Sequence, residues 1–125
     1  MSDHPNAARY RQLQDAMNAG DMSVMADSIA DDIEWWEIGA PEPVRGKAAL
    51  VERMQWFGDY EITTELHDVI ANDDHLIALL SVTATKGGET LDYRTAEIHH
   101  VNAAGQITQR WAFSDDTQAI IDFFS

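Results

Sequence analysis

ADDIEWWEIGAPEPVRGKAAL, residues 30–50, holds the features of the sequence that are most specific for the architecture. Ile33 to Ile38 is rich in branched and aromatic side chains, which predicts a strand, and Gly39 to Pro43 reads as a loop that ends it. Lys47 to Phe57 has apolar residues at helical spacing and predicts a helix. The same stretch places a carboxylate, Glu37, directly after two tryptophans, and this position needs a physical explanation.

Two further helices are predicted before this stretch. Asp3 to Met17 begins with a capping residue, has a proline in its first turn and repeats apolar side chains at helical spacing. Asn18-Ala19-Gly20 ends that helix, and Asp21 caps a shorter one that runs to Ile29. The first part of the chain is therefore expected to be mainly helical.

Four strands and a terminal helix are predicted after the stretch. The strands are expected at residues 60–71, 75–86, 89–101 and 106–113, separated by the turn sequences Asn72-Asp73-Asp74, Gly87-Gly88 and Asn102-Ala103-Ala104-Gly105. Asp115-Asp116 caps the helix, which is expected at Thr117 to Phe124. Helices first and an antiparallel meander afterwards indicate an α+β fold, with residues 1–125 forming one domain.

Composition excludes several classes of protein. The chain has 22 Asp and Glu against 8 Lys and Arg, and its net charge of −14 repels nucleic acid and anionic membrane surfaces. There are no cysteines, which excludes disulfides and thiolate metal sites. Without an apolar signal core or a run long enough to span a membrane, we expect a soluble, cytoplasmic protein. Its clustered basic residues, Arg45, Lys47 and Arg53, are predicted to be solvated.

The order of these elements resembles the nuclear transport factor 2 superfamily, and in particular its SnoaL-like and ketosteroid isomerase-like branch. NAGD at 18–21, the stretch at 30–50 and AEIHHVNAAGQITQRWAFSDD at 96–116 carry the resemblance, which covers nearly the whole chain. It implies a cone-shaped fold, in which three N-terminal helices pack on a strongly curved antiparallel or mixed sheet and a short C-terminal helix follows. It also implies a cavity for a small apolar molecule, and a homodimer formed through the open sheet face.

The resemblance assigns the role of a base to Glu37. Counted without a gap from Ala30-Asp31-Asp32, Glu37 falls where ketosteroid isomerases keep the aspartate that shuttles the proton. Strand alternation puts it on the face of Trp35, where burial would disfavour the charged form and suit the group to take a proton near neutral pH. Two alternatives stay open: a partly solvated Glu37 at the rim, or a bulge that turns Trp36 inward.

Glu97 is the second candidate, at the position of the protonated aspartic acid in the ketosteroid isomerase oxyanion hole. A neutral Glu97 would donate a hydrogen bond to a developing oxyanion, as a carboxylic acid held in an apolar site does in those enzymes. The alternative is an ion pair with Arg110, which would keep Glu97 ionised. His99, on the same strand face, is a further candidate acid or base, or else a hydrogen-bonded histidine that lines the pocket.

One catalytic residue of the ketosteroid isomerases has no counterpart, because Leu13 stands at the position of their tyrosine. Tyr93, or Tyr10 one helical turn from Leu13, are candidates to supply the missing phenol, with core packing as the alternative. The residues expected to contact a ligand are Tyr10, Leu13, Trp35, Trp36, Phe57, Tyr93 and Arg110.

Two functions fit these residues. The first is a small-molecule enzyme that isomerises, cyclises or dehydrates an apolar carbonyl compound by acid–base chemistry without a cofactor. Glu37 would be its base, and Glu97, with His99 or Tyr93, would stabilise the charged oxygen. The second is a non-catalytic module that binds a hydrophobic ligand or a protein. Glu37 and Glu97 in one cavity would favour the enzyme, whereas different compartments would favour binding.

Two other chemistries are not indicated. Adjacent histidines, His99 and His100, point to opposite strand faces and no His-x-x-x-His occurs, so no metal site is predicted. Epoxide hydrolysis needs a carboxylate–arginine–carboxylate cluster around a water, and the sequence pattern does not indicate one.

Overall fold

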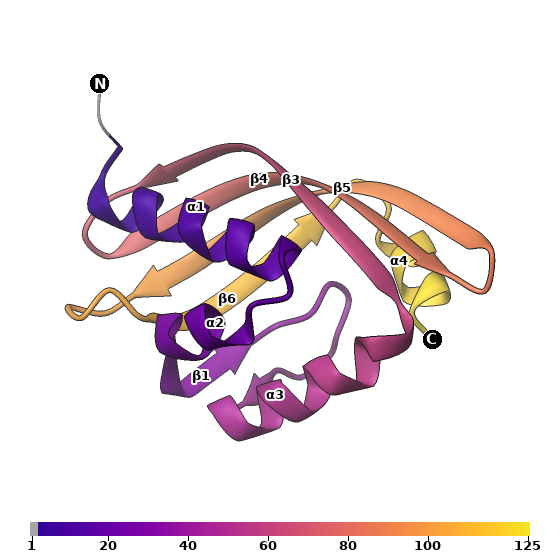
Figure 1. The fold of residues 1–125 in the computed structure, drawn as a ribbon, viewed down its shortest axis with the longest axis horizontal. Helices are drawn as coiled ribbons and strands as arrows, with labels where there is room; N and C mark the ends of the chain where they lie inside the picture. Colours follow the sequence, from indigo (N-terminus) through magenta and orange to yellow (C-terminus); the bar gives the residue numbers. More distant parts are fainter. Residues whose placement is uncertain (1–2) are drawn as a thin grey trace.

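Four helices and one curved sheet make up residues 3–125, the part of the chain that the computed structural model describes (Figure 1). The helices are α1 (Pro5–Asn18), α2 (Met22–Ser28), α3 (Lys47–Trp56), which continues into a 3₁₀ turn (Phe57–Asp59), and α4 (Thr117–Phe123). The strands are β1 (Ile29–Trp35), β2 (Val44–Arg45), β3 (Glu61–Ala71), β4 (His75–Lys86), β5 (Glu89–Val101) and β6 (Ile107–Ser114).

The sheet is mixed and open, with the strand order β2-β1-β6-β5-β4-β3. β3 to β6 are antiparallel neighbours in chain order, whereas β1 lies parallel to β6. Figure 1 shows α1, α2 and α3 on one side of the curved sheet and α4 near the end at which β4 turns into β5. The predicted α+β cone is therefore confirmed.

The predicted strand at 33–38 is displaced toward the N-terminus, because β1 begins at Ile29 and ends at Trp35. Ile29 pairs with Ile107 of β6, and the register shifts before Glu34 pairs with Gln109. Two adjacent aspartates are unfavourable in a strand, so the sequence alone did not indicate that β1 runs through Asp31 and Asp32. Tertiary pairing with β6 overrides this local preference.

The core lies between the helices and the concave face of the sheet. β4 shows the alternation most clearly, with Leu76, Ala78, Leu80, Val82 and Ala84 buried and the residues between them exposed. From the helices, Tyr10, Leu13 and Leu50 pack against this face. None of the helices in residues 3–125 is both long and apolar enough to cross a membrane.

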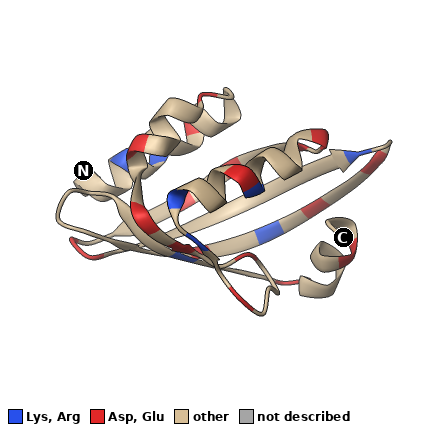
Figure 2. Cartoon of the chain, turned by 90° about the horizontal axis from the view of Figure 1, so that it is seen from below, with Lys and Arg blue, Asp and Glu red and all other residues tan. Residues whose placement is uncertain are grey.

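The charge of −14 is not confined to one region of the molecule. Figure 2 shows Asp and Glu spread over helices, strands and loops, with the fewer Lys and Arg between them. The negative electrostatic field is therefore a property of the whole surface, and any local function of a basic residue depends on its immediate partners.

Gly39 brings the loop after β1 into close contact with α4. Its φ is +75°, and a Cβ built there would lie 2.6 Å from Cδ1 of Ile121. A side chain at position 39 would therefore meet both an unfavourable backbone conformation and the packed face of α4. This contact fixes the loop that carries Glu37 against the terminal helix.

Replacing Gly39 by alanine is expected to destabilise the fold more than the same change at Gly20. Gly20 has a matching φ of +78° but nothing within 4 Å of a built Cβ, so its cost is only the left-handed backbone, about 1–2 kcal/mol. Gly39→Ala adds overpacking against Ile121, about 1–3 kcal/mol more. Urea unfolding of both variants measures the difference, and equal losses would contradict the packing argument.

Candidate functional site

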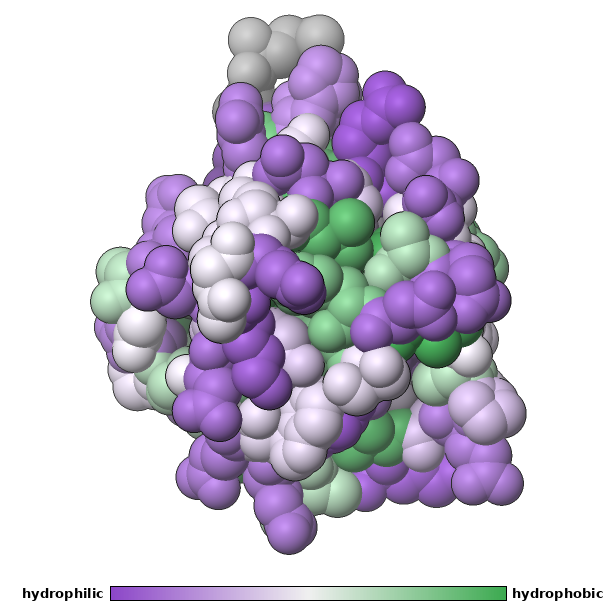
Figure 3. Space-filling view, turned by 90° about the vertical axis from the view of Figure 1, so that its right-hand side faces the viewer, coloured by the Kyte–Doolittle hydropathy of each residue, from purple (hydrophilic) through white to green (hydrophobic). Residues whose placement is uncertain are grey.

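A cavity of about 1040 Å³ lies between the concave sheet face and the helices. This is slightly above the range of about 300–1,000 Å³ that is usual for small-molecule sites, so the volume is sufficient for a ligand of several rings. On the face that carries α4 and the β4–β5 hairpin, hydrophobic residues are visible in the middle of the surface, with hydrophilic residues around them (Figure 3). The cavity thus combines an apolar interior with a polar surround.

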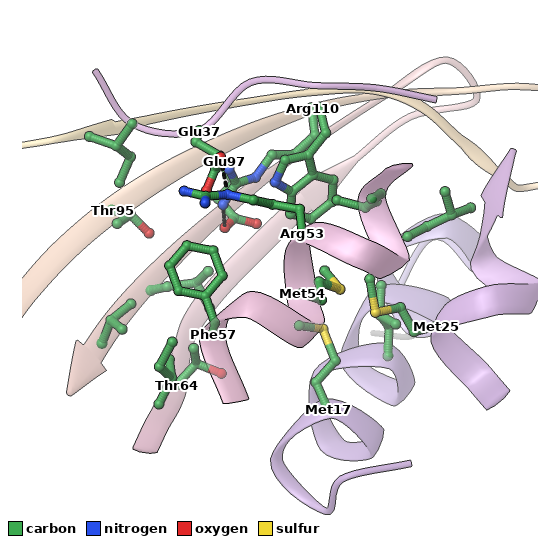
Figure 4. A pocket seen from close by; sticks show the side chains of 18 of the residues that line it. Met17, Met25, Glu37, Arg53, Met54, Phe57, Thr64, Thr95, Glu97 and Arg110 are labelled. Carbon is green, nitrogen blue, oxygen red and sulfur yellow. Dashed lines mark hydrogen bonds and ion pairs between the residues drawn. The ribbon is translucent and has the colours of Figure 1, made fainter. Parts of the chain in front are cut away.

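The two ends of the cavity differ in chemistry. At one end, Met17, Met25 and Met54 present flexible thioether side chains (Figure 4). At the other end, two carboxylate–guanidinium pairs come together, Glu37 with Arg53 and Glu97 with Arg110. Methionine adapts its shape to irregular ligands, so the polar end is the part that can fix a ligand's orientation.

Glu97 is buried at the polar end and is held by three donors. Arg110 Nη2 lies 2.6 Å from one carboxylate oxygen, while the Tyr10 hydroxyl and His99 Nε2 lie 2.8 and 3.0 Å from the other. Burial by itself would raise the pKa of Glu97, but the Arg110 charge and the His99 hydrogen bond outweigh it and hold the pKa well below its ordinary value. Glu97 is therefore ionised.

This geometry decides between the two interpretations of Glu97 in favour of the ion pair. An ionised carboxylate only accepts hydrogen bonds, so the neutral Glu97 that donates to an oxyanion is not what the structure contains. His99 likewise matches its second alternative, a hydrogen-bonded histidine. Its ring is 1% exposed, donates through Nε2 to Glu97 and packs edge-on against Tyr10.

Tyr10 supplies a phenol to the site from α1, although its hydroxyl is already engaged. It donates to Glu97 and accepts from Gln14 Nε2 at 2.8 Å, and Gln14 in turn accepts from the Thr64 hydroxyl. Burial and the neighbouring Glu97 charge raise the pKa of Tyr10 well above its ordinary value. This chain of hydrogen bonds joins β3, α1 and β5 along one wall of the cavity.

Arg110 is a pocket cation whose two Nη atoms are both engaged. Its register pairs it with Trp35 of β1 and with His99 of β5, which puts all three on the concave face. Nη2 binds Glu97, Nη1 donates to the Trp36 carbonyl at 2.9 Å, and the guanidinium lies 4.3 Å from the Trp35 ring. Arg110 thereby links the buried carboxylate to the chain just before Glu37.

Glu37 lies at the rim of the cavity, which was one of the alternatives left open by the sequence. Its side chain is 26% exposed and accepts a hydrogen bond of 2.8 Å from Arg53 Nε. The deep burial expected from strand alternation is absent because β1 ends at Trp35, two residues earlier. Both Glu37 and Glu97 nevertheless line the same cavity.

Trp36, expected to contact a ligand, lies outside the cavity wall. Its indole Nε1 donates to Glu34 at 2.9 Å, and its side chain is not part of the cavity wall. Its amide also bonds to the Arg110 carbonyl, so the alternation of faces continues past the end of β1 and turns Trp36 away from the cavity. The remaining expected ligand contacts, Leu13, Trp35, Phe57 and Tyr93, do line it.

Tyr93 differs from Tyr10 in having a hydroxyl without a hydrogen-bond partner among residues 3–125. Burial, with opposing effects of the Arg110 and Glu97 charges, raises its pKa to about 12. The phenol is therefore protonated at neutral pH and can donate a hydrogen bond to a ligand oxygen.

Arg53 is a cavity residue that the sequence prediction missed, since it was expected to be solvated. It extends from α3 toward Glu37 at the polar end (Figure 4). Leu50, Met54 and Phe57 lie three before, one after and four after it, which is the spacing of one helical face. That pattern could have indicated its direction, and Gln14, four residues after Tyr10, could have been found in the same way.

Residues 3–125 contain no group of three His, Asp or Glu side chains placed to hold a metal ion. The expectation that the protein needs no cofactor stays a prediction.

Comparison with known proteins adds a family to this geometry. The SnoaL-like domain model matches residues 10–110, whereas a search among curated proteins finds no match. Similar solved structures include a nuclear transport factor 2-like protein from Burkholderia pseudomallei (TM-score 0.84, 15% identity, 100% of this chain and 99% of that one). A second is an LEH-like epoxide hydrolase of Mycobacterium tuberculosis (TM-score 0.73, 18% identity, 88% of this chain and 82% of that one). A third is IdmH of Streptomyces antibioticus, a proposed polyketide cyclase (TM-score 0.74, 17% identity, 98% of this chain and 100% of that one). Identities this low show a shared fold only.

Stability is expected to depend on pH through Glu97. A depressed pKa in the folded state means that its contribution is present above the ordinary value of 4.5 and is lost as the pH falls below it. At about pH 7, Glu97→Gln should cost about 3–5 kcal/mol, because Arg110 is left buried without its partner. As the pH falls from 4.5 to about 3, the difference in free energy of unfolding between wild type and Glu97→Gln should decrease by about 2 kcal/mol.

Chemical denaturation across this pH range measures the effect. Glu61→Gln is the matched control, because Glu61 is an exposed glutamate of β3 outside the ion pairs of residues 3–125, and its curve should run parallel to wild type. A Glu97→Gln curve that also runs parallel to wild type would show that Glu97 is not ionised against Arg110.

Proposed function

The chain belongs to the SnoaL-like domain family, and from this premise we propose that it is a small-molecule enzyme acting by acid–base chemistry on an apolar ring compound that carries a carbonyl group. One observation carries the proposal: Glu37 and Glu97 line the same cavity, one at its rim and the other ionised at its base. Two carboxylates in different environments can take different roles in one reaction.

A passive hydrophobic binding site would not need this arrangement. Burying an ionised carboxylate is costly unless it is paired and hydrogen-bonded, and apolar residues of similar volume are often as stable. The cavity instead keeps Glu97, Arg110 and their hydrogen-bond partners beside an apolar wall. This favours catalysis over the alternative of a non-catalytic binding module.

In the proposed reaction, Glu37 takes a proton from the carbon next to the ligand carbonyl. The electron pair of that C–H bond moves to the carbonyl oxygen, which becomes an enolate and accepts a hydrogen bond from Tyr93. Return of the proton to another carbon gives isomerisation. Attack by the enolate carbon on a second carbonyl carbon of the same molecule, whose oxygen takes the proton from Glu37, gives cyclisation. Loss of a β-hydroxyl that takes the proton from Glu37 and leaves as water gives dehydration.

Glu97 serves this reaction indirectly, since it is ionised and poorly basic. It fixes Arg110 and Tyr10, and Arg110 in turn holds the Trp36 carbonyl next to Glu37. We assign Glu97 and Arg110 as positioning residues, and Glu37 and Tyr93 as the groups that contact the substrate.

Epoxide hydrolysis, the activity in the name of one structural neighbour, is less well supported. It would need two carboxylates on one arginine around a water. Arg110 pairs with Glu97, whereas Glu37 pairs with Arg53, so the two carboxylates have separate guanidinium partners.

Hydrogen–deuterium exchange tests the proposed proton transfer directly. Wild-type protein in D₂O should accelerate loss of the α-proton NMR signal from at least one member of a panel of cyclic ketones and enones. Glu37→Gln should slow this exchange about 100- to 10,000-fold, because general base catalysis is lost. Tyr93→Phe should slow it about 100-fold by removing the donor to the enolate oxygen.

Glu34→Gln is the matched control, since Glu34 precedes Glu37 by three residues but bonds to Trp36 and Arg45 outside the cavity. The Glu34→Gln variant should accelerate α-proton exchange as much as the wild type does. A wild-type protein that binds the ring ketones without accelerating exchange would contradict the enzyme and support the binding module.

We also propose that the outer sheet face forms a homodimer. Exposed and half-buried apolar side chains occupy neighbouring positions there: Ile70 pairs with Ile77, Ile77 with Ile98, Leu79 with Ala96, and Ala96 with Phe113. Ile70 and Phe113 are 61% and 58% exposed, and contiguous apolar surface of this kind is typical of an interaction site.

Ile77→Lys should shift the protein from dimer to monomer, because it places a charge in the middle of the apolar face at both copies. Sedimentation velocity gives the oligomeric state. Val51→Lys, at an exposed apolar position near the cavity mouth, should leave the dimer intact. A monomeric wild type would refute the proposed interface.

A further inference from the structure

We propose that Arg53 binds the anionic oxygen of an acidic ring compound, so that the substrates of this cavity are enols, hydroxyquinones or ketones that become enolates. The inference deepens the proposed function and rests on it. Arg53 lies at the polar end of the cavity, on α3, with its side chain 34% exposed and its guanidinium turned toward Glu37 (Figure 4).

The guanidinium of Arg53 has a free edge. Its Nε donates to Glu37, while Nη1 and Nη2 form no hydrogen bond with residues 3–125. The two Nη groups form the end of a planar fork that matches two oxygens, or one oxygen between them, in a charge-assisted contact. A ligand oxygen at this edge lies on the far side of the guanidinium from Nε, so the positive charge separates it from Glu37.

The orientation of this fork is set by aromatic side chains. The Arg53 guanidinium carbon lies 4.4 Å from the Trp56 ring centre and 4.5 Å from that of Phe57. These cation–π contacts hold the planar group without using any of its N–H donors. Phe57 packs edge-on against Phe124, and Phe124 against Tyr93, so a series of aromatic contacts connects Arg53 to Tyr93 along the cavity wall.

The other two Lys and Arg side chains of the cavity wall, Arg110 and Lys47, have their terminal nitrogens engaged by protein acceptors. Both Nη atoms of Arg110 are bound, one to Glu97 and one to the Trp36 carbonyl. Lys47 donates to the Ala26 carbonyl at 2.7 Å and lies 3.4 Å from an Asp31 oxygen. Arg110 Nε has no partner but is buried behind these contacts. Arg53 is thus the cavity cation, among residues 3–125, whose two Nη groups are both free for an anionic group.

The pair with Glu37 connects the anion-binding role of Arg53 to the proposed proton transfer. When Glu37 takes the proton of a ligand C–H, it becomes neutral and the C–H electron pair places negative charge on the ligand oxygen. The Arg53 charge is then released from Glu37 at the moment at which a new anion forms next to it. Base and oxyanion-binding group are therefore coupled through one hydrogen bond of 2.8 Å.

Binding of two matched probes tests this assignment without catalysis. 2-Hydroxy-1,4-naphthoquinone is an anion at neutral pH, and its methyl ether is a neutral compound of similar shape. By isothermal titration calorimetry, the wild type should bind the anion more tightly than the ether. Arg53→Gln should reduce this preference about 10- to 100-fold, as expected for loss of hydrogen bonds to a charged group, with little change for the ether.

Three variants make the result specific. Arg45→Gln removes the same charge from an arginine that is 70% exposed and outside the cavity, and should keep the preference. Arg53→Lys keeps the charge but loses the fork, and should give an intermediate preference. Glu37→Gln should strengthen binding of the anion, because a negative charge is removed while Arg53 stays; a merely structural pair would instead weaken both probes.

The outcomes separate this inference from the proposed function. An unchanged preference in folded Arg53→Gln, or a folded wild type that binds neither probe, overturns the role of Arg53. Anion preference through Arg53 without any α-proton exchange would support the ligand site but refute the enzyme. If the protein accelerates α-proton exchange but does not prefer the anionic probe, only the anion-binding role of Arg53 is refuted.

Discussion

The buried contact between Glu97 and Arg110 is the constraint on which the candidate site depends. A carboxylate in an apolar interior has to be fully hydrogen-bonded, and its donors come from α1, β5 and β6. Because Arg110 also binds the Trp36 carbonyl, the same contact fixes the loop that carries Glu37. One ion pair thereby fixes the positions of the first helix, the sheet and the rim of the cavity relative to one another.

The two carboxylates of the cavity are kept apart by their guanidinium partners. Glu97 is enclosed, and its lowered pKa keeps it charged near neutral pH, so it shapes the site without taking up a proton there. Glu37 is partly solvated, and its pair with Arg53 can open without exposing a buried charge. A buried pair of this kind gives little net stability compared with apolar packing, so its value lies in placing charge and geometry.

Much of the fold follows from local sequence signals, but the contacts of the site do not. Strand alternation correctly grouped Tyr93, Glu97 and His99 on one face, since that rule depends only on neighbours in the chain. The bond from Tyr10 to Glu97 joins residues 87 positions apart, and no periodicity predicts which donor reaches a buried carboxylate. Arg53 was missed because a charged side chain on a helix is usually solvated.

The methionine side chains at the end of the cavity opposite the two ion pairs are groups that an oxidant can modify. Met17, Met25 and Met54 contribute sulfur atoms to a surface that has to stay apolar to hold a ring system. Conversion of a thioether to its sulfoxide introduces a polar, hydrogen-bonding group there, and reductases can reverse the change. The redox history of the protein would therefore change which ligands it accepts, while its charged residues stay as they are.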